Sequence, residues 1–77
     1  MNKTIEELLE QIAEQKRQKT AARAAIMECT LAGEFKLAAQ SASLYLAAES
    51  NEYNFRSQLA AKRGHELVAQ ASKLLPL

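Results

Sequence analysis

The sequence predicts an all-α protein built as an antiparallel helical hairpin. Helix formers dominate the composition, with fifteen alanines and many Leu, Glu, Gln, Lys and Arg, whereas valine and proline occur once each and aspartate is absent. Apolar residues recur at helical spacing along most of the chain. Gly33 can close a helix in the left-handed conformation, so we expect helices over about residues 4–32 and 34–75 to pack side by side.

The first helix has a recognisable start. Thr4 and Glu7 have the spacing of a capping box, in which each side chain accepts a hydrogen bond from the backbone of the other residue. Apolar residues then follow at helical spacing, pause through a polar stretch, and resume before Gly33: Ile5, Leu8, Leu9, Ile12, Ile26, Met27 and Leu31. The segment from Cys29 to Ala38 resembles the corner of a tetratricopeptide helix pair, which implies a helix–helix turn at Gly33.

The second half of the chain favours one long helix. Its longest apolar stripe follows a period of about 3.6 residues: Phe35, Ala38, Ala39, Ala42, Leu46, Tyr53, Ala60, Leu67, Val68, Ala71 and Leu75. We expect this stripe to face the first helix. Ser50 and Asn51 are poor helix formers that could cap a third helix from Glu52, so a three-helix bundle with a break near Ser50-Asn51 is the alternative.

A second apolar strip lies opposite the first on the same helix, and we interpret it as a partner-binding surface: Leu37, Leu44, Ala48, Phe55 and Leu59. One hairpin partner cannot cover both faces of a helix. The second helix would span roughly 61 Å against roughly 42 Å for the first, so its end would also overhang. A homodimeric four-helix bundle, or a helix of another protein, would cover both surfaces.

Charged residues interrupt the helix faces at matching levels. In a hairpin that turns at Gly33, residue i lies near residue 66 minus i, roughly, which places cations of the first helix beside glutamates of the second. We define these residues as the polar belt: Lys16, Lys19, Arg23, Glu49 and Glu52. Exposed pairs stabilise by only about 0 to 1 kcal/mol, so the belt would set the register of the hairpin more than its stability. The alternative is that these charges are solvated and the first helix bends near residues 15–19.

The sequence offers little for catalysis. His65 is the only histidine and Cys29 the only cysteine, and neither has neighbours at the spacing of a metal site or a nucleophile–base pair. We interpret them as a surface histidine and a small packing residue. The repeated glutamates of the first helical turns fit the helix dipole. We therefore expect no enzymatic activity and no cofactor or metal.

The leading hypothesis is a small protein–protein interaction module: a regulator, adaptor, inhibitor or chaperone-like protein that binds itself and another protein. Its alternative is a nucleic-acid-binding bundle that uses Lys16, Arg17, Lys19 and Arg23. The net charge is only +1, so no global field would attract nucleic acid. Without a membrane-length apolar run or a second cysteine, a cytoplasmic location is expected. Short helical chains of this type are common among phage and mobile-element accessory proteins, a class this chain would fit.

Overall fold

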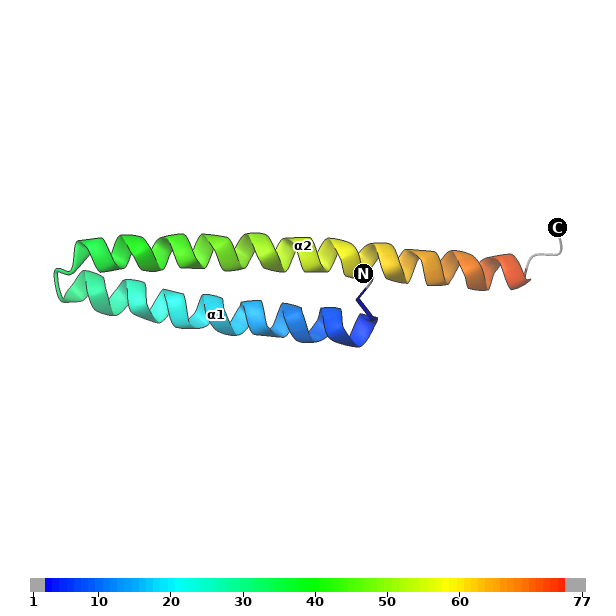
Figure 1. Ribbon diagram of the computed structural model, residues 1–77, viewed down its shortest axis with the longest axis horizontal. Helices are drawn as coiled ribbons and strands as arrows, with labels where there is room; N and C mark the ends of the chain where they lie inside the picture. The colour runs from blue at the N-terminus through cyan, green and yellow to red at the C-terminus, as the bar shows by residue number, and fades with distance from the viewer. Residues whose placement is uncertain (1–2, 75–77) are drawn as a thin grey trace.

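The computed structural model describes residues 3–74 and contains two long α-helices packed antiparallel (Figure 1). Helix α1 spans Ile5–Leu31 and helix α2 spans Phe35–Leu74. The predicted all-α hairpin is confirmed, with element limits within about a residue of those expected. The alternative break is wrong, because α2 continues through Ser50 and Asn51 without interruption. Their weak helix propensity costs only about 0.7 kcal/mol or less per residue, which packing of the helix outweighs.

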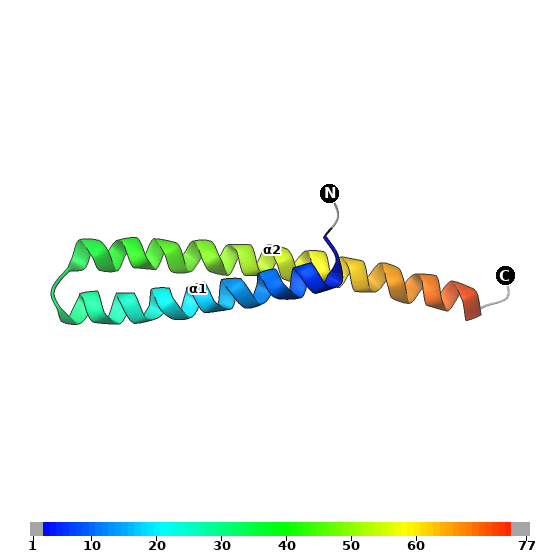
Figure 2. The same cartoon turned by 60° about the horizontal axis from the view of Figure 1, so that its bottom comes forward.

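Both ends of α1 are closed by hydrogen bonds. At its start, the Thr4 hydroxyl accepts from the Glu7 N–H at 3.1 Å, and the Glu7 carboxylate accepts from the Thr4 N–H at 3.3 Å. At its end, the Glu34 N–H donates to the Cys29 carbonyl at 2.8 Å, and the Gly33 N–H donates to Thr30 at 3.1 Å. This pattern is a Schellman motif. Gly33 occupies its left-handed position with φ 76°, which supports the turn visible in Figure 2.

The two glycines give opposite predictions. Gly33→Ala should lower the free energy of unfolding by about 1–2 kcal/mol, because a Cβ is strained at positive φ. Gly64→Ala should raise the helical content of α2, since the glycine lies within the helix, nothing lies within 4 Å of an added Cβ, and Ala is favoured there by about 0.5–1 kcal/mol. Urea unfolding followed by circular dichroism measures both effects. A destabilising Gly64→Ala would contradict this account.

The two helices meet along a heptad seam. Residues alternate three and four apart in the seam, as in a coiled coil. In α1 it consists of Ile5, Leu8, Ile12, Gln15, Lys19, Ala22, Ile26 and Cys29. In α2 it consists of Ala38, Ser41, Tyr45, Ala48, Glu52, Phe55, Leu59 and Lys62. Every one of these side chains is buried or half-buried, so the seam extends from the turn to the first turn of α1.

The side of α2 that faces α1 differs from the side predicted from the sequence. Ala48, Phe55 and Leu59, which were expected to face a partner, instead pack towards α1. Most of the stripe expected to face α1 lies in solvent, including Leu46 and Tyr53, while Leu75 lies outside the described residues. The prediction was wrong because it followed apolar residues alone at a period of 3.6, whereas the seam keeps a period of 3.5 and includes polar residues.

The apolar core is narrow. Leu8, Ile12 and Leu59 form its buried cluster, with Ile5 and Phe55 packed at the edge. Elsewhere the seam combines polar and charged residues with small ones such as Ala22 and Ala48, which let the two helices approach closely. Few large side chains therefore leave water when the hairpin folds.

Truncation of the core cluster tests this description. Leu8 is 2% exposed and Leu9 is 44% exposed, so the two neighbours form a matched pair. Leu8→Ala should lower the free energy of unfolding by about 2–5 kcal/mol, and Leu9→Ala by clearly less. The measurement is urea unfolding at one fixed protein concentration. Equal losses in the two variants would show that the seam is misplaced.

Helix α2 extends well beyond the start of α1 (Figure 1). The seam ends at Lys62, and the following part of α2, residues 63–74, which we name the overhang, has almost wholly exposed side chains. The molecule measures 66 × 20 × 16 Å. Neither α1 nor the described part of α2 is long and apolar enough to cross a membrane.

Candidate functional site

The centre of the seam contains an ion pair. The Lys19 ammonium lies 3.1 Å from the Glu52 carboxylate, and the Arg56 guanidinium lies 2.9 Å from its other oxygen. Glu52 is only 7% exposed. A carboxylate at this depth needs a cation beside it, because water can no longer solvate it fully. The pair joins the two helices, and it is the part of the polar belt that the structure brings together.

The contacts of Glu52 change its acidity. The close contact with the Lys19 ammonium holds the pKa of Glu52 below its usual range, burial acts in the opposite direction, and the charges of Arg56, Lys19 and Lys16 lower the pKa further. A lowered pKa in the folded state means that the ionised carboxylate stabilises the fold.

The sign of this effect predicts a pH dependence. The contribution of Glu52 is fully present above the ordinary pKa of 4.5 and is lost as the pH falls through the lowered pKa of the folded state. The free energy of unfolding should therefore decrease below about pH 4.5, and it should decrease less in Glu52→Gln. Urea unfolding across this pH range measures it. Parallel curves for the two proteins would refute a role for the Glu52 carboxylate.

The other members of the polar belt lie at the edge of the seam. Arg23 donates a hydrogen bond to the Tyr45 hydroxyl at 3.3 Å, and its guanidinium carbon lies 5.8 Å from the centre of the Tyr45 ring. Lys16 and Glu49 are exposed, and among residues 3–74 neither forms an ion pair. The belt is thus an inner pair surrounded by solvated charges.

Gln15 is a further polar residue inside the seam, and the sequence reasoning did not identify it. Its side chain is buried, and its Oε1 has no hydrogen-bond partner within the described part of the chain. An unsatisfied buried amide costs stability. The polar groups of the seam thus specify the register of the two helices. The apolar area buried in the seam is small and contributes little to the stability of the hairpin.

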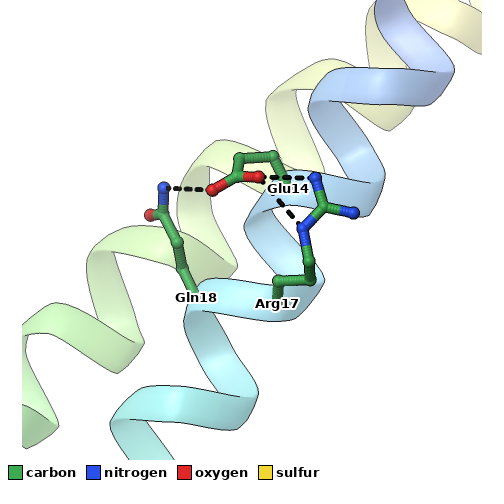
Figure 3. Close-up of polar contacts among 3 residues, drawn as sticks. All are labelled: Glu14, Arg17 and Gln18. Carbon is green, nitrogen blue, oxygen red and sulfur yellow. Dashed lines mark hydrogen bonds and ion pairs between the residues drawn. The ribbon is translucent and has the colours of Figure 1, made fainter.

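The basic residues of the nucleic-acid alternative do not form one surface. Arg17 donates to the Glu14 carboxylate, which also accepts from Gln18 at 3.4 Å (Figure 3). The hydrogen bonds from Arg17 and Gln18 hold the pKa of Glu14 below its usual range, which favours its ionised form beside Arg17. Lys19 points into the seam towards Glu52. Only Lys16 and Arg23 remain together on one side of α1.

The two candidate catalytic residues lie far apart. Cys29 is half-buried beside the turn. His65 lies at the other end of the hairpin, where an open cleft of 630 Å³ forms between the start of α1 and α2, lined by Lys3, Leu8, Gln58, Ala61, Lys62, His65 and Glu66. This lining holds charged groups of both signs and no Ser, Thr or Cys. No group of three potential metal ligands occurs in residues 3–74.

The predicted partner-binding strip is reduced to two residues. Leu37 and Leu44 are exposed, whereas Ala48, Phe55 and Leu59 belong to the seam. At the next heptad intervals after Leu44, the same side of α2 carries polar residues: Asn51, Gln58 and His65. This side is therefore apolar only near the turn.

The opposite side of α2 carries a longer series of apolar residues. Six residues recur at intervals of exactly one heptad, and all are exposed. We name them the outer stripe: Ala39, Leu46, Tyr53, Ala60, Leu67 and Leu74. The outer stripe follows α2 from the turn into the overhang, and Phe35 adds an exposed aromatic ring at its start.

A recess in α1 adjoins this surface near the turn. Its volume is 340 Å³, its lining is almost wholly apolar, and it is formed by Ile26, Met27, Thr30 and Leu31. Met27 follows the seam residue Ile26 as Leu46 follows Tyr45, and equivalent heptad positions of two antiparallel helices lie on the same side of the pair. The recess and the outer stripe therefore lie on the same side of the hairpin.

The hairpin exposes more surface than a compact protein of the same mass. The chain exposes 6157 Å², whereas a compact monomer of 8.5 kDa exposes about 4,650 Å². The excess of about 1,500 Å² is larger than the roughly 800 Å² that each partner buries in an interface of standard size. This excess follows from the elongated shape of the hairpin.

Comparisons with protein-family models, with curated proteins and with solved structures each find no match. The function is therefore inferred from the geometry of the chain itself.

Proposed function

We propose that this protein is a non-enzymatic interaction module that binds a partner helix through the outer stripe of α2. The observation that carries the proposal is the heptad recurrence of exposed apolar residues along α2, from Ala39 to Leu74. The residues of the outer stripe lie about 10 Å apart along α2, so a partner helix with the same repeat would contact them in turn. The hairpin would act as the rigid support that presents the stripe.

The spacing favours a helix as the partner. A repeat of seven residues keeps one side of a helix aligned with a second helix over a long distance, because both supercoil at 3.5 residues per turn. An extended peptide has a side-chain period of two and would not follow this repeat. A partner helix could lie along α2 and reach the apolar recess of α1 near the turn.

This proposal covers a regulator, adaptor, inhibitor or chaperone-like role, each of which needs a helix-binding surface. It also covers a homodimer, in which the partner helix comes from a second copy. The nucleic-acid alternative draws less support from the arrangement of charges, since Lys19 pairs with Glu52 and Arg17 with Glu14.

Site-specific photo-crosslinking tests the proposal. Leu46 is 62% exposed and belongs to the outer stripe, while Leu44 is 66% exposed and lies on the other side of α2. A photo-reactive amino acid at position 46, in cells that express the chain, should form adducts with a polypeptide. The same amino acid at position 44 should form far fewer.

Adducts with either another protein or a second copy would support the proposal. Equal or greater crosslinking at position 44 would contradict it, and so would the absence of polypeptide adducts at position 46. Leu46→Glu, compared with Leu44→Glu, should remove the adducts formed by the same photo-reactive amino acid placed at position 53. Circular dichroism controls for folding in each variant.

A further inference from the structure

We infer that the outer stripe is covered by the outer stripe of a second copy of this chain, lying antiparallel about a two-fold axis near residues 56 and 57. The inference rests on the proposed function and names the partner helix. It follows from three features of the stripe: the sizes of its residues, the charges beside it, and the position of the overhang.

The sizes of the stripe residues are complementary when the stripes of two copies are paired antiparallel. In this register Tyr53 lies opposite Ala60 of the second copy, and Ala39 lies opposite its Leu74, so that a large residue meets a small one. Leu46 lies opposite Leu67 of the second copy. Alternation of large and small residues across an interface fills space without overpacking.

The charges beside the stripe favour the same register. Glu49 and Arg63 are exposed on the seamward edge of the stripe, and neither forms an ion pair within the described chain. They are fourteen residues apart, about 21 Å along the helix, and cannot meet within one copy. The antiparallel register places Glu49 of each copy beside Arg63 of the other, so the pair occurs twice.

The charge at the axis is compatible with this arrangement. Arg56 lies nearest the two-fold axis and would approach Arg56 of the second copy. It lies 2.9 Å from Glu52 in its own chain, a carboxylate that it shares with Lys19, so the repulsion between the two Arg56 side chains is only partly offset. A parallel arrangement would be worse, because Glu49 would face Glu49 and Arg63 would face Arg63.

The overhang gains a partner in the same arrangement. Residues 63–74 of one copy lie along residues 39–50 of the other, which begin about one helical turn after the start of α2. Leu74 of one copy therefore reaches the turn end of the other, where Ile26, Met27, Thr30 and Leu31 form the apolar recess. The outer stripe and the recess of α1 thus both belong to the one contact.

Charge reversal tests the register. Sedimentation equilibrium of the full chain should show a reversible dimer, and Glu49→Arg or Arg63→Glu should each raise its Kd by about tenfold, since each change converts two attractions into two repulsions. The double variant E49R/R63E should return Kd close to that of the wild type. Glu28→Arg, which makes the same charge change as Glu49→Arg on the other side of the hairpin, should leave Kd unchanged.

A wild-type chain that stays monomeric at all concentrations overturns the inference. A dimer in which the double variant is no better than the single ones also overturns it. In either case, crosslinking of position 46 to another protein would leave the proposed function standing. Far-ultraviolet circular dichroism of each variant at high concentration keeps loss of folding separate from loss of association.

Discussion

The carboxylate of Glu52 must be paired wherever it is buried, and this requirement organises the hairpin. Lys19 provides the pairing cation from α1, at 3.1 Å. If the next residue of α2 took the place of Glu52 in the seam, α2 would be rotated by about 100° about its axis. The Glu52 carboxylate and the Lys19 ammonium would then be separated. The pair therefore determines the side of α2 that faces α1. By the same geometry it determines that Leu46 and Tyr53 face outwards.

The features that depend on local chemistry could be predicted from the sequence. Thr4 and Glu7 form the expected capping box, and Gly33 adopts the expected left-handed turn. Both follow from interactions within a few residues. The level at which Lys19 meets Glu52 could also be predicted, because the turn position sets which residues are opposite in a hairpin.

The faces of α2 could not be predicted from apolar residues alone. Ser41 and Glu52 occupy the interior, while Leu46 and Tyr53 lie outside, so hydrophobicity does not separate the two sides. The paired charge was the available signal. Glu52 lies opposite the cation Lys19, which indicates that Glu52 faces the other helix. When Glu52 is included among the interior residues, the seam with its period of 3.5 residues can be identified. The burial of Gln15 has no such signal, because its buried oxygen has no partner in the described chain.

The distribution of residue sizes links stability to association. Alanines in the seam bring the two helices close together, but they remove little apolar area from water. Larger apolar side chains, including Leu46 and Leu67, lie on the outside. Much of the apolar area of this sequence is thus exposed in the single hairpin, and the proposed partner helix would cover part of it. With such a partner, the stability of the protein would depend on its own concentration or on that of the partner.

The overhang has a consequence for the lifetime of the chain. Its backbone hydrogen bonds are those of a single helix without tertiary support, so they open far more readily than those of the seam. Lys62 and Arg63, at its base, provide cleavage points for a protease that recognises basic residues. A bound partner would hold this segment helical and shield it. Degradation could then remove copies that have found no partner while sparing those in a complex.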